Sequence, residues 1–397
     1  MTMVQARADA ERSRRPATHR GLSVGKAIFV VIGMVAMVIG VWGPVARTAH
    51  ASSSGSYNVV GNKIVDPNGA RFVPYGFVIS CLSAPVIWCL NSGPNHPSGI
   101  SQQVQAAATT WHANTVRFQV AEEHLFDQAP YDATYLNQLD AAVNQANSLG
   151  MVAVISLQEE KYNGPLMPTQ SALSFWNLIA AHYAANPRVF FDLYNEPRLT
   201  VTQTGGDPEL LWSIWRNGGT VGGMTYVGMQ SLVDGIRATG SSNITIAEGI
   251  LWATSLLGIP QWSLSGTNIA YGIKPDLSGT AVGPQSWYAD FGSVAGQVPV
   301  FPQEFDSNVS SGTCQPNAPT LLPSLLSYLA TLQLGLVDYS MDPGNAAINA
   351  SNYQLPTSYP SSTISCVPNT QTDPLNLIGN GVDLQNWFTA HSSPAVP

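Results

Sequence analysis

The stretch "VFFDLYNEPR", residues 189–198, decides the fold, because its apolar run stops abruptly at an amide and a carboxylate. Residues 189–195 carry the β-branched and aromatic side chains that are typical of a buried strand. Glu196 follows, and Pro197 cannot donate a hydrogen bond to a strand ladder. Either the strand tip places polar groups in a cleft or the chain simply leaves the sheet here. Only the rest of the sequence distinguishes these two interpretations.

From residue 72 onward, short β-rich runs alternate with amphipathic segments. The predicted strands cover residues 72–79, 115–120, 151–157, 189–195, 243–249, 268–273, 299–305 and 336–341. Residues 133–150 are typical of the helices between them, because apolar side chains recur at helical spacing before Gly150. Residues 255–267 show no clear helix. Eight alternating units predict an α/β fold, a parallel sheet closed as a (β/α)8 TIM barrel. A doubly wound open sheet is the alternative, but no G-x-G-x-x-G follows an early strand.

In such a barrel, functional side chains lie at the carboxyl ends of the strands and in the loops that follow them. Asn195 and Glu196 end the fourth strand, and Glu304 in "PVFPQEF" ends the seventh. Two carboxylates from nonadjacent strands can therefore face each other across one barrel mouth. Glu248 ends the fifth strand and is a further candidate at the same mouth.

These residues resemble the retaining (β/α)8 clan of glycoside hydrolases, and the cellulase-like family 5 in particular. In that family an Asn-Glu-Pro closes strand four and a Glu-Phe closes strand seven, as residues 195–197 and 304–305 do here. The segment "NTVRFQV" (114–120) is similar to the family's strand with an active-site arginine, which here is Arg117. The likeness covers roughly residues 57–391.

The resemblance implies hydrolysis of β-O-glycosidic bonds in a glucan- or mannan-like polysaccharide or oligosaccharide, with no cofactor and no metal. It identifies Glu196 as the acid/base, Glu304 as the nucleophile of a double displacement, and Asn195 as the partner of the sugar 2-hydroxyl. Arg117 would keep the nucleophile ionised. Retaining hydrolysis needs two carboxyl groups about 5–5.5 Å apart. Unequal surroundings then keep one protonated and the other charged.

The chain departs from the family pattern on three strands. A histidine that often ends strand three is Gln158 here, and the family's His-x-Tyr of strand six aligns with residues 274–276, Lys-Pro-Asp. The tryptophan of strand eight aligns with Tyr339 or Met341. A Lys274 ammonium close to Glu196 would favour the ionised carboxylate and oppose its role as an acid. Two alternatives therefore stay open, a carbohydrate-binding barrel with weakened turnover and a transglycosylase that uses the same covalent intermediate.

Several tryptophans lie in predicted loops after strands, where an indole face can stack on the apolar C–H face of a sugar. Trp252, next to the fifth strand, is the favoured subsite residue. Packing is the alternative for each of the others, Trp88, Trp212, Trp215 and Trp262.

The first 51 residues predict a secretory signal peptide, which leaves one catalytic domain over residues 52–397. Basic residues precede the uncharged run 27–42, which is shorter than the roughly 20 residues that span a bilayer. Ala49 and Ala51 then fit the small-x-small pattern of a cleavage site. We therefore expect a secreted, extracellular protein, with an uncleaved membrane anchor formed by residues 27–42 as the alternative.

All four cysteines, Cys81, Cys89, Cys314 and Cys366, follow this leader, in a part of the chain where disulfides would persist. Four cysteines allow three connectivities. The barrel interpretation favours one bond inside the loop after strand one, Cys81–Cys89. It favours a second, Cys314–Cys366, between the loop after strand seven and the long excursion at 344–380. No cysteine or histidine cluster has metal-ligand spacing, so no metal site is predicted.

The charge of the chain excludes two classes of partner. The formal net charge of the 397 residues is −8, and the first 51 hold seven Lys/Arg and two Asp/Glu, so the remainder carries −13. Nucleic acid and anionic membrane surfaces attract basic proteins and are therefore not expected as partners. An uncharged glycan fits this balance, and a monomer is expected.

Overall fold

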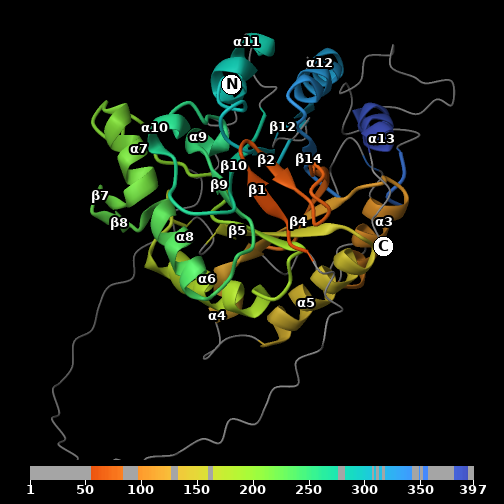
Figure 1. Cartoon of the computed structure of the whole chain (residues 1–397), viewed down its shortest axis with the longest axis horizontal. Coiled ribbons are helices and arrows are strands. Elements are labelled where there is room, and N and C mark those ends of the chain that lie inside the picture. Colours follow the sequence, from red (N-terminus) through yellow and green to blue (C-terminus); the bar gives the residue numbers. More distant parts are fainter. Residues whose placement is uncertain are drawn as a thin grey trace, which may run out of the picture. The chain divides into compact units, whose positions relative to one another are not determined.

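Eight parallel strands form the centre of the fold, and helices surround them (Figure 1). The computed structural model describes residues 55–83, 97–126, 133–159, 164–275, 282–305, 308–309, 313–314, 318–341, 348, 352–355 and 380–391. The barrel strands are β3 (Tyr75–Leu82), β4 (Thr115–Ala121), β5 (Val152–Glu159), β6 (Val189–Asp192), β9 (Thr245–Glu248), β10 (Ile269–Ile273), β11 (Val300–Pro302) and β14 (Leu336–Asp338). They pair in the order β11-β10-β9-β6-β5-β4-β3-β14. A parallel bridge between Phe305 and Asp338 joins the two ends of this order. The predicted (β/α)8 barrel is therefore confirmed.

Each predicted strand has its counterpart in the barrel, but the fourth, seventh and eighth are shorter than expected. The ladder of the fourth ends at Asp192, so the prediction that the strand continues to Asn195 was wrong. The seventh and eighth end at Pro302 and Asp338, so the predicted ends at residues 305 and 341 were wrong as well. Leu193 still donates its backbone N–H to Ile246, and Asn195 donates to Leu157. The segment that leads to Glu196 is thus held by single hydrogen bonds after regular pairing has stopped.

The helical layer follows the expected alternation. Its members are α3 (Pro97–Thr109), α4 (Glu122–Phe126), α5 (Ala133–Ser148), α6 (Gln170–Tyr183), α7 (Pro208–Asn217), α8 (Gly228–Ala238), α9 (Ile250–Ala253), α10 (Ile259–Trp262), α11 (Pro284–Trp287) with a π-helical turn at Tyr288–Gly292, α12 (Ala318–Thr331) and α13 (Asn380–His391). Local sequence explains several starts. Asp207 caps α7 by accepting from the backbone N–H groups of Glu209 and Leu210, with Pro208 in the first turn. Between β9 and β10 only the four-residue α9 and α10 occur, as the missing helical pattern at 255–267 predicted.

Short antiparallel hairpins complete the described fold. They are β1–β2 (Asn58–Val60 and Lys63–Val65), β7–β8 (Gly219–Val221 and Met224–Tyr226) and β12–β13 (Asn308–Val309 and Thr313–Cys314). Tyr57, beside β1, packs edge-on against Phe72 and Phe190 with ring centroids 5.1 and 5.3 Å apart. These rings belong to the cluster that fills the barrel interior. Because that cluster occupies the amino-terminal part of the strands, polar groups at the opposite end remain for function.

Two apolar clusters hold the molecule together. The larger one lies between strands and helices, and the smaller fills the barrel with one or two side chains from every barrel strand except β4, such as Val78, Val154 and Ile246. Beyond this apolar layer, inward-facing positions become polar at Arg117 and Asp192, both fully buried. The interior therefore changes from apolar to charged along the barrel axis.

Several predictions concern residues outside the described ranges. The leader 1–51, Cys89, Cys366 and Asp276 are among them. Cys81 is disulfide-bonded, but the connectivity stays a prediction. Within the described ranges, no helix has the length and apolar character that would let it cross a bilayer.

Candidate active site

Arg117 on β4 is the centre of a buried ionic cluster at the carboxyl end of the barrel. Its Nε donates to Asp192 Oδ2 at 2.8 Å, its Nη2 to Glu248 Oε1 at 2.9 Å, and its Nη1 to Glu304 Oε2 at 2.8 Å. The guanidinium is fully buried, as are Asp192 and Glu248. Two neutral acceptors of Nη2, Ser156 Oγ and Asn195 Oδ1, complete the cluster, each at 2.8 Å.

Burial and neighbouring charges shift the pKa values inside this cluster. Burial alone would lower the pKa of Arg117, but Asp192, Glu248 and Glu304 outweigh it and the pKa is raised. Burial raises the pKa of Glu248 well above its ordinary range, and the negative charge of Asp192 adds to the rise. Lys274 and Arg117 oppose that rise without cancelling it. The guanidinium is therefore permanently charged, and Glu248 holds its proton more tightly than an exposed glutamate does.

A second cation, Lys274, contacts both glutamates of the predicted catalytic pair. Its Nζ lies 2.7 Å from Glu304 Oε1 and 2.9 Å from Glu196 Oε1. The other oxygen of Glu304, Oε2, also accepts from Gln119 Nε2 at 3.1 Å. The side chains of Lys274, Glu304 and Glu196 are 11%, 13% and 19% exposed, so this group lies nearer to solvent than the Arg117 cluster. One ammonium thus brings the two carboxylates together.

Glu196 occupies an unusual backbone conformation. Its φ of 54° lies in the left-handed region, which costs an L-residue roughly 1–2 kcal/mol. In this conformation its backbone N–H donates to Glu248 Oε2 at 2.6 Å. Glu248 is itself fixed by Arg117, so the buried cluster determines where the Glu196 backbone lies.

A left-handed turn after β9 connects the Glu196 loop with Lys274. Leu251, Trp252 and Ala253 have φ values of 56°, 60° and 62°. The backbone N–H of Trp252 donates to Pro197 at 3.0 Å, and Ala253 accepts from the backbone N–H of Lys274 at 2.8 Å. The Trp252 ring is partly exposed, as a stacking surface for a sugar requires.

Gly272 makes room for part of this arrangement. A Cβ at this position would lie 2.7 Å from Gln303 Oε1, closer than real Cβ contacts, and 3.0 Å from Glu248 Cγ, which is tighter than most of them. Gln303 is fully buried, and neither polar atom of its amide has a hydrogen-bond partner in the described structure. A glycine on β10 therefore lets these two side chains share the space without displacement.

The remaining predicted site residues lie at the same end of the barrel. Gln158, near the end of β5, is partly buried, and its Oε1 has no partner among the described groups. Tyr339 follows β14 and packs against the barrel-interior cluster, whereas Met341 is buried in the outer core. Of the two residues aligned with the family's tryptophan, Tyr339 is therefore the one that faces the barrel axis.

Two tryptophans that were predicted to lie in a loop belong to the core instead, because they lie on α7. Trp212 and Trp215 are buried and pack against each other with ring centroids 5.3 Å apart. Trp215 Nε1 donates to the backbone carbonyl of Glu248 at 2.8 Å. Their rings support the fifth strand and are not available to a sugar, which leaves Trp252 as the better subsite candidate.

Asp192, Ser156 and Gln119 also bond the ionic groups, although they were not among the residues predicted from the sequence. The alternation of inward- and outward-facing side chains along each strand could have identified two of them. Asp192 lies two residues after Phe190 and so faces the same side of its strand, which is the barrel interior. Gln119 lies two residues after Arg117 and faces inward for the same reason. A polar residue at an inward position of an otherwise apolar strand marks the point where the barrel becomes polar.

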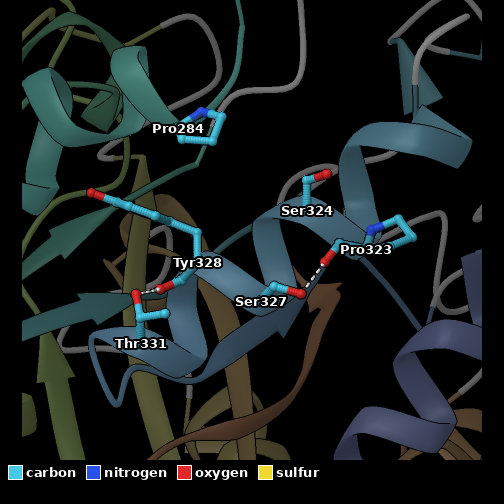
Figure 2. A pocket seen from close by; sticks show the side chains of 6 residues that line it. All are labelled: Pro284, Pro323, Ser324, Ser327, Tyr328 and Thr331. Atoms are coloured by element: carbon cyan, nitrogen blue, oxygen red, sulfur yellow. Dashed lines mark hydrogen bonds between the residues drawn. The ribbon is translucent and has the colours of Figure 1, made fainter.

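A surface groove of about 440 Å³ lies elsewhere, between α11 and α12 (Figure 2). Its lining residues, Pro284, Pro323, Ser324, Ser327, Tyr328 and Thr331, include no carboxylate or imidazole. The hydroxyls of Ser327 and Thr331 donate to carbonyls of their own helix, as Figure 2 shows. This groove offers no acid–base pair. Among the described residues, no group of histidines, cysteines and carboxylates could hold a metal ion either.

Comparison with known proteins agrees with this geometry. The profile of the cellulase family, glycosyl hydrolase family 5, matches residues 81–342, which is more than half of the chain. The chain belongs to glycosyl hydrolase family 5. The predicted resemblance and the glycoside hydrolase class are thereby confirmed at the level of the family.

Two curated relatives are similar in sequence to part of this chain. Endoglucanase gh5-1 of Neurospora crassa is 29% identical over 37% of this chain, and endoglucanase 3 of Humicola insolens is 28% identical over 36%. The matched region spans only about a third of those proteins, 32% and 31% of their lengths.

Solved structures share the fold. A β-glucanase from Saccharophagus degradans, solved with cellotetraose, aligns over 86% of this chain and 95% of its own, at a TM-score of 0.61 and 20% identity. The catalytic domain of Thermobifida fusca endoglucanase Cel5A aligns over 84% of this chain and 97% of its own, at a TM-score of 0.55 and 16% identity. At these identities the likeness concerns the barrel architecture.

Proposed function

We propose that this family 5 protein is a secreted, retaining β-glycoside hydrolase that cleaves a β-glucan-type polysaccharide or oligosaccharide. One observation carries the proposal: a single ammonium contacts Glu304 at 2.7 Å and Glu196 at 2.9 Å. The two oxygens must therefore be closer together than the sum of those contacts. This limit on one pair of oxygens favours the close carboxyl groups of retaining enzymes over the roughly 6.5–9.5 Å of inverting enzymes, which need room for a water between the carboxylates.

The surroundings of each group support the division of roles. Glu304 accepts from Arg117, whose permanent charge favours a carboxylate ready to attack the anomeric carbon. Glu196 lies on the other side of Lys274 and is the acid that protonates the leaving oxygen, then the base for the incoming water. Asn195 accepts from Arg117 through Oδ1, which directs its amide nitrogen elsewhere, toward a sugar 2-hydroxyl. Trp252 supplies a stacking surface, and Gln158 and Tyr339 would contact the same sugar.

The substrate class follows from relatives and from charge. The curated relatives are endoglucanases, and one solved neighbour binds cellotetraose. An uncharged glucan also suits a chain whose residues after the leader carry −13. A carbohydrate-binding barrel with weakened turnover is the second candidate, because Lys274 pairs with the group that must act as an acid.

A hydrolysis screen on a panel of soluble β-glucans, mannans and xylans separates these candidates. Turnover by the wild type that disappears in Glu304→Ala supports the hydrolase. Glycan binding without turnover favours the binding barrel. Products longer than the substrate at high substrate concentration identify a transglycosylase.

The stereochemical test uses Glu196→Ala and an activated aryl glycoside, whose departure needs little acid assistance. The glycosyl-enzyme should form and accumulate, and azide, which needs no base, should restore turnover as a β-glycosyl azide. Proton NMR of the first product reads the configuration. An α-azide, or an inverted wild-type product, would overturn both glutamate roles.

Export is part of the same proposal. The mature protein should begin near Ser52 and contain two disulfides that join Cys81, Cys89, Cys314 and Cys366. Intact-mass measurement of the exported protein should show loss of the leader and of four hydrogens. A retained leader would indicate a membrane-anchored enzyme, and four alkylatable thiols would remove the disulfide assignment.

A further inference from the structure

Lys274 is fixed at both ends between the two glutamates. Its backbone N–H donates to Ala253 in the left-handed turn, and buried Pro275 follows it. Its Nζ reaches Glu304 Oε1 and Glu196 Oε1 at 2.7 and 2.9 Å. An ammonium has three donors and can serve both oxygens at once. Either contact can therefore strengthen while the other weakens, without a movement of the main chain.

The two oxygens of Glu304 have different partners. Oε2 accepts from Arg117 and Gln119 and is directed toward the buried cluster. Oε1 contacts Lys274, whose side chain is partly exposed. Oε1 is therefore the oxygen on the solvent side, where a sugar would bind. One oxygen of each glutamate therefore lies against the same cation.

We propose that Lys274 is a catalytic residue whose ammonium pairs with whichever of the two glutamates is charged at each stage of the reaction. This inference rests on the proposed retaining mechanism. In the first step Glu304 bonds to the anomeric carbon, the bond to the leaving oxygen breaks, and the proton of Glu196 goes to that oxygen. In the second, water bonds to the anomeric carbon, its proton goes to Glu196, and the ester bond to Glu304 breaks. The negative charge thus passes from Glu304 to Glu196 and back, always beside Lys274.

The surrounding carboxylates favour the charged form of Lys274 in this structure. The ionisable side chains that face it are Glu196 after β6, Glu248 on β9, Glu304 after β11 and Arg117 on β4. Burial alone would lower the pKa of the lysine, but the three glutamates outweigh burial and Arg117 and raise it. Lys274 therefore favours the ionised form of Glu196. That should confine acid assistance to lower pH and make Glu196 a ready base once Glu304 is esterified.

Kinetics on two probes measure these effects separately. Hydrolysis of cellotetraose needs a protonated Glu196, so the alkaline limb of its kcat/KM profile reports the acid form. For dinitrophenyl β-cellobioside the first step is fast without an acid, so the acidic limb of kcat reports Glu196 as the base in the glycosyl-enzyme. Lys274→Met should move both limbs upward by about one to three pH units, the usual effect of losing an adjacent opposite charge.

Lys274→Arg is the control, because it keeps the charge and should leave both limbs close to their wild-type positions. A merely structural lysine would lower the rates of Lys274→Met without moving either limb, and that result would overturn the proposal. Failure of the wild type to turn over any glycan would instead overturn the hydrolase function, and this inference with it. If turnover depends on Glu304 but the pH limbs of Lys274→Met stay at their wild-type positions, the proposed hydrolase function is supported and only the role of Lys274 is wrong.

Discussion

Two cations neutralise carboxylates in this barrel, and they do so at different depths. Arg117 is fully buried and donates to Asp192, Glu248 and Glu304, whereas the Lys274 side chain is 11% exposed and contacts Glu196 and Glu304. Burial makes an unpaired charge expensive, so the deep cluster should tolerate little change. Near solvent, water and salt partly screen a carboxylate that has lost its cation. The deep cation therefore supports the fold as well as the site, and the outer cation adjusts chemistry.

The two cation clusters share residues. Glu304 accepts from both cations, and Glu248 accepts from Arg117 through Oε1 and from the Glu196 backbone through Oε2. The positions of the outer groups thus depend on the inner ones. The following variants test whether the two clusters differ in this way, and how tightly they are coupled.

The largest effect is expected for Arg117→Met. The variant would leave Asp192, Glu248 and Glu304 without their common cation, which should cost about 3–5 kcal/mol of unfolding free energy and abolish turnover. Urea unfolding and the glycan screen measure the two effects. Arg71→Met is the matched control, since among the described residues the Arg71 guanidinium bonds the neutral Gln333 and Leu332 groups, and its loss should cost about 1 kcal/mol or less. Similar losses in both variants would contradict the special role of the deep cluster.

A smaller effect is expected for Glu248→Ala, which removes the acceptor that holds the Glu196 backbone N–H. Release of Glu196 from its left-handed conformation should lower kcat about 100-fold with little change in KM, because the acid/base is misplaced. Glu248→Gln keeps one acceptor oxygen and should recover part of this loss. An unchanged kcat in Glu248→Ala would show that the two clusters are independent.

Glu248 also makes stability depend on pH. Its pKa is raised in the folded protein, so its stabilising contribution is fully present below the unfolded value of about 4.3 and is lost as pH rises toward the folded value. Urea unfolding of Glu248→Gln should therefore show a flatter dependence on pH than the wild type over that interval. A steeper dependence would mean that Glu248 is ionised in the fold.

The smallest effect is expected for Gly272→Ala. The new Cβ would meet Gln303 Oε1 and Glu248 Cγ at 2.7 and 3.0 Å, and overpacking of this kind costs about 1–2 kcal/mol. Adding Gln303→Ala should restore most of the lost stability, because it removes the closest obstacle. Thermal unfolding of the single and double variants checks this. No recovery in the double variant would place the strain at Glu248.

The order of elements and the candidate pair could be predicted from sequence, because both depend on local patterns. Alternating β-rich and amphipathic runs require a parallel sheet, and parallel strands bring their carboxyl ends to one mouth. That rule predicts Asn195, Glu196 and Glu304 at the same mouth. Strand limits were less accurate, since Leu193 and Tyr194 look like strand residues but lie beyond the last pair of β6.

Only the tertiary structure decided which carboxylates share a cation. The sequence suggested Lys274 beside Glu196, but not its contact with Glu304, and it gave no reason to join Asp192 and Glu248 to Arg117. These contacts link strands that are far apart in the chain, and their distances depend on barrel closure and on left-handed turns at Glu196 and residues 251–253. Periodicity specifies which face a side chain occupies. The electrostatic partner across the barrel depends on three-dimensional packing, because charge interactions vary with distances and burial that no local pattern contains.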